Sequence, residues 1–172
     1  PVTIFMPDWM SAERIALIAS FGATIVLVSR AQGGFVGSIR MSEELAADDP
    51  SVFLPCQFSN DANVAAHYRT TGPEIWEQTK GEVTHVVCSP GTGGTVTGVG
   101  RYLKEKNPEL KVWGIDTYGS VFKKLKETGI FDKNEIYPYI TEGIGEDFVP
   151  QNVDMDLIDH FEKVTDRDAA IY

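Results

Sequence analysis

The chain has 172 residues, of which 42% are hydrophobic and 23% are charged. This ordinary globular composition excludes wholesale disorder, collagen and coiled coil, and the length allows one domain or parts of two. The 25 acidic residues outnumber the 15 basic ones for a net charge of −10, which argues against nucleic acid as a partner because phosphate contact needs Lys and Arg.

Three further classes are disfavoured by the residue pattern. The apolar run from Ile15 to Ser29, which carries no charge, is shorter than the roughly 20 residues that a membrane helix needs. Cys56 and Cys88 form no disulfide framework, so a cytoplasmic location is expected. The three histidines are scattered, so no metal site is expected.

Strand-like and helix-like patterns alternate along the chain. In chain order they predict a strand at 2–6, a helix between a Ser11 cap and Gly22, a strand at 24–28, a helix at 35–47, a strand at 52–54, a helix at 63–79 interrupted by Gly72-Pro73, a strand at 84–88, a helix at 95–106 and a strand at 111–115. Such alternation favours an α/β fold with a largely parallel sheet. A lobe boundary is expected near Asp61.

A glycine-rich turn, Ser89 to Thr95, lies between a predicted strand and a predicted helix. Glycines let the backbone approach a ligand closely, and the N-terminus of a helix offers unpaired N–H groups to an anion, most often phosphate. A side chain at Gly93 is then expected to collide with the bound phosphate or to block the φ that the turn needs. The alternative is a tight turn that binds nothing.

The turn does not match the common nucleotide motifs. A dinucleotide fingerprint needs a third glycine where this chain has Val96. Asp116 at the end of the next strand nevertheless keeps a nicotinamide cofactor open as an alternative. A P-loop would need a lysine that the turn lacks.

Two other segments are candidates for a binding site. Gln57 follows the predicted strand at 52–54, where its amide could donate to a substrate carboxylate. Gly143 and Gly145 could bring the backbone to the wall of a pocket. The alternatives are a loop glutamine bonded to water and an ordinary turn. Acids are frequent from Glu142 onward, which predicts a solvated acidic face.

These motifs together, in this order and spacing, resemble the cysteine synthase and cystathionine β-synthase family, pyridoxal-phosphate enzymes of fold type II. The motifs are Met6-Pro7-Asp8-Trp9-Met10-Ser11, Gln57-Phe58-Ser59-Asn60, His67-Tyr68-Arg69-Thr70-Thr71-Gly72-Pro73-Glu74-Ile75-Trp76, Gly91-Thr92-Gly93-Gly94-Thr95 and Glu142-Gly143-Ile144-Gly145.

The resemblance implies a three-layer α/β fold, with twisted, mostly parallel sheets between helices in two lobes. Residues 1–62 would be the second half of the smaller, mobile lobe, and residues 63–172 the middle of the larger one. The cofactor would be pyridoxal 5′-phosphate, with its phosphate held by Gly91, Thr92, Gly93, Gly94 and Thr95. Gln57 would bind the substrate carboxylate, and Gly143, with Gly145, would lie beside cofactor and substrate.

The resemblance also implies that some catalytic parts lie elsewhere. The lysine that forms the Schiff base belongs to an upstream segment of the family, and no lysine from Lys80 to Lys163 fits its motif. No catalytic residue is therefore expected in this chain, which looks like the central half of the catalytic core. It is not expected to catalyse alone.

The activity implied is a β-replacement on serine or an O-activated serine by a thiol nucleophile, with small-molecule substrates and a homodimeric full-length enzyme. The stretch Glu142–Pro150 looks more like cystathionine β-synthase, which joins serine and homocysteine. The stretch Gln57–Asn60 looks more like cysteine synthase, which joins O-acetylserine and sulfide. A non-catalytic α/β module that binds a phosphorylated ligand is the alternative of another class.

Overall fold

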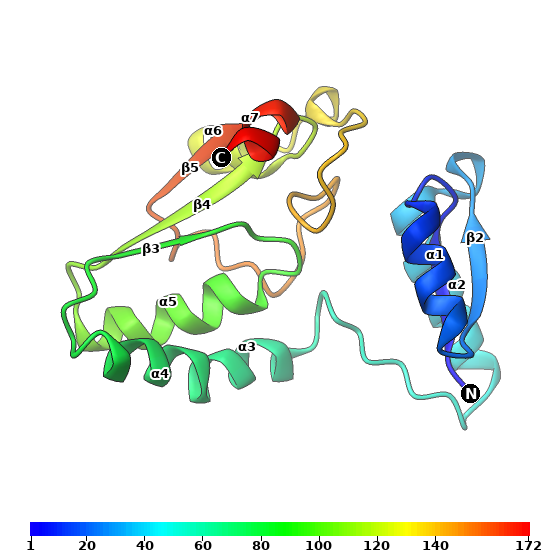
Figure 1. Cartoon of the computed structure of the whole chain (residues 1–172), viewed down its shortest axis with the longest axis horizontal. Coiled ribbons are helices and arrows are strands. Elements are labelled where there is room, and N and C mark those ends of the chain that lie inside the picture. Colours follow the sequence, from blue (N-terminus) through cyan, green and yellow to red (C-terminus); the bar gives the residue numbers. More distant parts are fainter. The chain divides into compact units, whose positions relative to one another are not determined.

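In the computed structural model, which describes all 172 residues, the chain forms two compact units, residues 1–55 and 56–172. Both contain parallel strands flanked by helices, which confirms the predicted α/β class (Figure 1). The division falls a few residues before the boundary expected at position 62, and the assignment of the units to the two lobes of the family stays a prediction. No helix has the length and apolar character needed to cross a membrane.

The N-terminal unit is a single β-α-β motif followed by a long helix. Its elements are β1 (Thr3–Pro7), α1 (Ala12–Ser20), β2 (Thr24–Val28), the 3₁₀ helix η1 (Arg30–Gln32) and α2 (Gly34–Asp48). The two strands pair in parallel, with Thr3 opposite Thr24. As predicted, Ser11 caps α1 by accepting a hydrogen bond from the backbone N–H of Arg14.

The C-terminal unit contains a three-stranded parallel sheet in the order β3-β4-β5. Its elements are α3 (Asp61–Arg69), α4 (Thr71–Gln78), β3 (His85–Cys88), α5 (Gly94–Lys106), β4 (Lys111–Thr117), α6 (Phe122–Thr128), the 3₁₀ helix η2 (Lys133–Glu135), β5 (His160–Val164) and α7 (Asp166–Ile171). Helix α5 packs against the sheet, and α3 and α4 pack against α5 (Figure 1).

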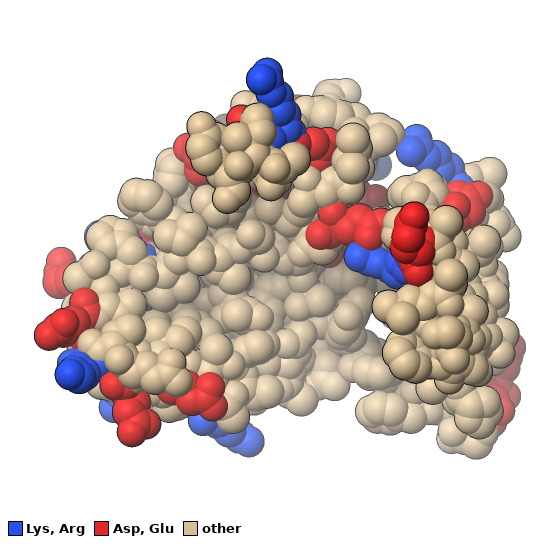
Figure 2. Space-filling view, in the orientation of Figure 1, with Lys and Arg blue, Asp and Glu red and all other residues tan.

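One face of this sheet carries the core of the unit. The strand order follows the chain order, and right-handed crossovers then place the connecting helices on the same face. Gly100 of α5 lies against Val112, and Phe122 of α6 stacks on Phe161 with ring centroids 5.9 Å apart. On the side shown in Figure 2, the middle of the unit is a broad uncharged area, and charged side chains of both signs lie around it.

Two predicted elements differ in the structure. Residues 52–54 are not a strand, because no neighbouring strand pairs with them. The helix expected at 63–79 breaks at Thr70, before Gly72-Pro73, so these two residues lie in the first turn of α4, which begins at Thr71. Proline is well suited to the first turn of a helix, where its missing N–H needs no partner.

Candidate functional site

The glycine-rich turn joins β3 to the N-terminus of α5 and leaves several donors unpaired. Gly93 precedes the helix in the left-handed conformation, with φ of 87° and no capping side chain. The backbone N–H groups of Thr92, Gly93 and Thr95 have no acceptor within the chain. Donors of this kind at the positive end of a helix are suited to an anion.

The hydroxyl group of Thr92 is oriented by two neighbours. Its oxygen accepts from the side-chain amide of Asn63 at 3.2 Å and lies 3.4 Å from the backbone nitrogen of Gly94. Because both contacts use the oxygen as acceptor, the hydroxyl proton remains available to an anion at the turn. Thr92 therefore adds a directed donor to the backbone N–H groups.

Two glycines allow α3 to lie unusually close to α5. A Cβ at Gly94 would be 1.9 Å from the Oδ1 of Asn63, and one at Gly98 would be 2.5 Å from the carbonyl oxygen of Val64. These contacts bring Asn63 and His67 of α3 beside the turn. Sequence reasoning missed both residues, because their role depends on helix packing that no local pattern reveals.

Gly93 is constrained both by its left-handed φ and by a neighbouring residue of the protein. A Cβ at this position would lie 2.3 Å from the Cγ2 of Val153 and 2.7 Å from its backbone nitrogen. The side chain would therefore meet the protein whether or not a ligand is bound, and the φ of 87° agrees with the expectation that a side chain would block the φ that the turn needs. Substitution of Gly93 cannot separate a ligand site from a structural turn.

Gln57 lies next to the turn, although not at the end of a strand. Gln57 is exposed, and it follows Cys56, whose backbone has φ of 53°. Its backbone carbonyl accepts from the side-chain amides of Asn63 at 3.1 Å and of Asn152 at 2.9 Å. Since Asn63 also bonds Thr92, one amide group links the Gln57 segment to the turn.

The loop that carries Gly143 lies on another side of the same turn. The backbone N–H of Gly145 donates to the carbonyl of Pro90 at 3.0 Å. Gly143 has φ of 80°, no atom lies within 4 Å of where its Cβ would be, and it lines a cavity of about 450 Å³ together with Ser89 and Ile115. The structure thus brings Gln57, Gly143 and the turn together within the C-terminal unit.

Two acids in this loop contradict the solvated face expected from Glu142 onward. Glu146 and Asp147 are half-buried, and Oδ1 of Asp147 has no hydrogen-bond partner. Burial raises the pKa of the Glu146 carboxyl to about 8, and the neighbouring Asp147 adds to this increase. Burial also raises the pKa of Asp147.

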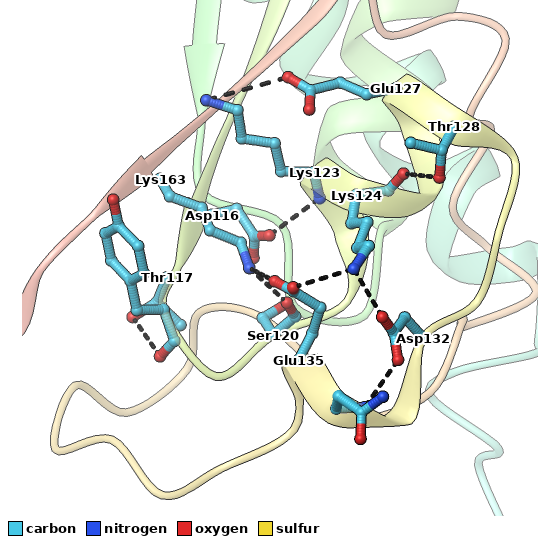
Figure 3. Close-up of polar contacts among 12 residues, drawn as sticks. Asp116, Thr117, Ser120, Lys123, Lys124, Glu127, Thr128, Asp132, Glu135 and Lys163 are labelled. Atoms are coloured by element: carbon cyan, nitrogen blue, oxygen red, sulfur yellow. Dashed lines mark hydrogen bonds and ion pairs between the residues drawn. The ribbon is translucent and has the colours of Figure 1, made fainter.

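A polar network supports the Glu146 loop, and Figure 3 shows its members Ser120, Glu135 and Lys163. The ammonium group of Lys163 donates to the carbonyl of Ser120 at 2.8 Å and pairs with Glu135 at 2.7 Å. The hydroxyl of Ser120 in turn accepts from the backbone N–H of Glu146 at 3.1 Å. The side chains of β5 and η2 therefore fix the position of this loop.

Asp116 is not placed to bind a ribose. Its side chain is completely buried, and its Oδ2 accepts from the backbone N–H of Lys123 at 3.0 Å (Figure 3). The carboxylate thus serves the N-terminus of α6, and the nicotinamide alternative loses the residue on which it depended.

Comparisons with known proteins show the family to which the chain belongs. The chain matches the family described as pyridoxal-phosphate dependent enzyme over residues 1–171. It is 41% identical to cysteine synthase 3 of Caenorhabditis elegans over 168 residues, covering 98% of this chain and 47% of the relative. It is 34% identical to cystathionine beta-synthase of Apis mellifera over 168 residues, covering 96% of this chain and 32% of the relative.

A solved hydrogen sulfide-producing enzyme from Fusobacterium nucleatum superposes with a TM-score of 0.86 at 42% identity, covering 98% of this chain and 49% of that one. The chain thus spans about half the length of that enzyme and of the nematode relative. The family match extends over almost every residue, and the chain belongs to the family of pyridoxal-phosphate dependent enzymes.

Proposed function

We propose that the turn from Gly91 to Thr95 binds the phosphate of pyridoxal phosphate in an enzyme that carries out β-replacement on serine or an O-activated serine. The observation that carries this proposal is the set of unpaired N–H groups at the N-terminus of α5, together with the directed hydroxyl of Thr92. When bound, the cofactor acts as an electron sink for the amino-acid substrate.

The residues present fit a phosphate group in charge. The turn supplies backbone and hydroxyl donors with no acidic side chain of its own, and the dipole of α5 favours the negative charge. Several lysines of the chain have partners away from the turn: Lys104 with Asp159, Lys123 with Glu162, Lys124 with Asp132, and Lys163 with Glu135. This supports the expectation that the lysine for covalent attachment lies outside the chain.

Thr92→Val in the full-length apoprotein is expected to weaken pyridoxal phosphate binding by roughly 10- to 100-fold, because it removes a hydrogen bond to a charged group. The valine keeps the shape of threonine but removes the acceptor of the Asn63 amide, so the melting temperature of the apoprotein should fall only modestly while the cofactor affinity falls strongly. Titration with the cofactor measures the affinity. Thr84→Val, before β3, is the control and should bind normally; equal affinities in the two variants would show that the turn does not hold the phosphate.

We further propose that the amide of Gln57 binds the carboxylate of the substrate. Gln57→Ala in the full-length enzyme should lower kcat/KM for the amino-acid substrate by roughly 10- to 100-fold, because an amide donor to a charged group is lost. Cofactor content should stay near normal. Gln78→Ala on α4 is the matched control, and kinetics of Gln57→Ala indistinguishable from it would remove Gln57 from the site.

The nucleophile is proposed to be homocysteine, with serine as the other substrate, because the Glu142–Pro150 stretch looks like that of the cystathionine enzymes. The second candidate is sulfide with O-acetylserine, which the Gln57–Asn60 stretch favours. Product analysis of the purified full-length protein supplied with each pair of substrates separates the two. Cofactor binding without turnover of either pair would indicate a binding module instead.

A further inference from the structure

His67, in the last turn of α3, lies between two threonine hydroxyl groups. Its Nε2 is 3.1 Å from the Oγ1 of Thr95, and its Nδ1 is 2.9 Å from the Oγ1 of Thr71. The two hydroxyls make no other hydrogen bond within the chain. The ring therefore connects the beginning of α4 to the beginning of α5.

Helix packing fixes the ring in this position. A Cβ at Gly98 would be 2.7 Å from the Cβ of His67, so the missing side chain at Gly98 is what allows α3 to bring His67 this close. The imidazole is half-buried, and a partner at each nitrogen defines the plane of the ring.

A neutral imidazole has one N–H group and one bare nitrogen, so it has two ways to satisfy this pair of hydroxyls. With the proton on Nε2, the ring donates to Thr95 and accepts from Thr71, and the Thr95 proton is available to a ligand. With the proton on Nδ1, the ring accepts the Thr95 proton, and Thr95 presents only lone pairs to the turn. A bound anion can use only the first arrangement.

We propose that His67 is a positioning residue that directs the Thr95 hydroxyl toward the phosphate by donating from Nε2. The proposal rests on the proposed function in one respect, namely that the phosphate lies at the turn. Binding of the phosphate should consequently select the tautomer that carries the proton on Nε2.

The test uses the full-length apoprotein labelled with ¹⁵N in its histidines. Long-range ¹H–¹⁵N spectra distinguish the two tautomers of neutral histidine, and the His67→Gln variant identifies the signals of His67. Addition of pyridoxal phosphate, or of inorganic phosphate, should move these signals to the pattern of an Nε2–H ring. His85 and His160, which lie on β3 and β5, should not change in the same way.

Affinity provides a second readout. His67→Leu should weaken binding of the apoprotein to pyridoxal phosphate by roughly 3- to 10-fold, the worth of one oriented hydrogen bond. His67→Gln should remain within about twofold of the unsubstituted protein, because its amide N–H can replace the Nε2 donor.

Tight phosphate binding with His67 still protonated on Nδ1 would overturn the proposal and leave the proposed function intact. Equal loss of affinity in His67→Leu and His67→Gln would also overturn it. If neither phosphate compound binds the apoprotein at all, the proposed function fails and the role of His67 fails with it.

Discussion

Gly94→Ala is expected to destabilise the full-length protein by about 1–3 kcal/mol and to weaken its binding of pyridoxal phosphate. The new methyl group would lie 1.9 Å from the Oδ1 of Asn63 and 2.3 Å from its Cγ, so the side chain of Asn63 must move. Its amide would then lose its bonds to Gln57 and Thr92. Urea unfolding of the apoprotein and cofactor titration measure the two effects.

A double-mutant cycle with Asn63→Ala separates two effects of Gly94→Ala on stability. One is the clash with Asn63, and the other is the changed helix propensity at residue 94. In an Asn63→Ala background the clashing atoms are gone, so Gly94→Ala should cost little stability there. Cofactor affinity should nevertheless stay low, because Thr92 has lost the amide that orients it. If Gly94→Ala destabilises both backgrounds equally, contact between α3 and α5 at this point is not what requires glycine.

Glu146→Gln is expected to stabilise the protein increasingly as the pH rises from about 5 to 8. The pKa of the Glu146 carboxyl is about 8 in the folded chain, against an ordinary value of 4.5. Between these values the folded state binds more protons than the unfolded state, so its stability falls as the pH rises through about 8. One such group changes the free energy of unfolding by at most about 1.4 kcal/mol per pH unit. Glutamine does not titrate, so the variant lacks this contribution.

Melting temperatures of the two proteins, measured across this pH range, check the expectation. The curves should meet near pH 5 and diverge toward pH 8, with the variant above. Glu77→Gln, an exposed position on α4, is the control and should stay parallel to the unsubstituted protein. Parallel curves for Glu146→Gln would mean that its carboxyl is ionised in the folded state at neutral pH.

The elements that could be predicted from the sequence are those with a strong local signal. β2 is a continuous β-branched run, and the turn before α5 combines glycines with threonines between a strand and a helix. The strand expected at 52–54 is absent, because a strand depends on a hydrogen-bonding neighbour as well as on apolar residues.

The candidate site could be predicted only at positions where the residue type itself suggests a role. Glycine at a turn suggests close approach of a backbone, and the resemblance to a family pointed to Gln57 and Gly143. Asn63 and His67 could not be found in this way, since each acts through a partner about thirty residues away. Glu146 was assigned to a solvated face because a cluster of acids is usually exposed, whereas the loop packs against the segment that follows β4, where Ser120 and Val121 bond the backbone of Glu146.

The amide of Asn63, which bonds both Gln57 and Thr92, has a thermodynamic consequence. Ordering of either neighbour favours the same orientation of this one side chain, so the proposed binding of phosphate at Thr92 and of carboxylate at Gln57 would be linked through it. Linkage is reciprocal: by whatever factor a phosphate at Thr92 improves the affinity for a carboxylate at Gln57, the carboxylate improves retention of the phosphate. If the proposed sites are right, saturation of the full-length enzyme with the amino-acid substrate would therefore raise its affinity for the cofactor, and replacing Asn63 would weaken this coupling.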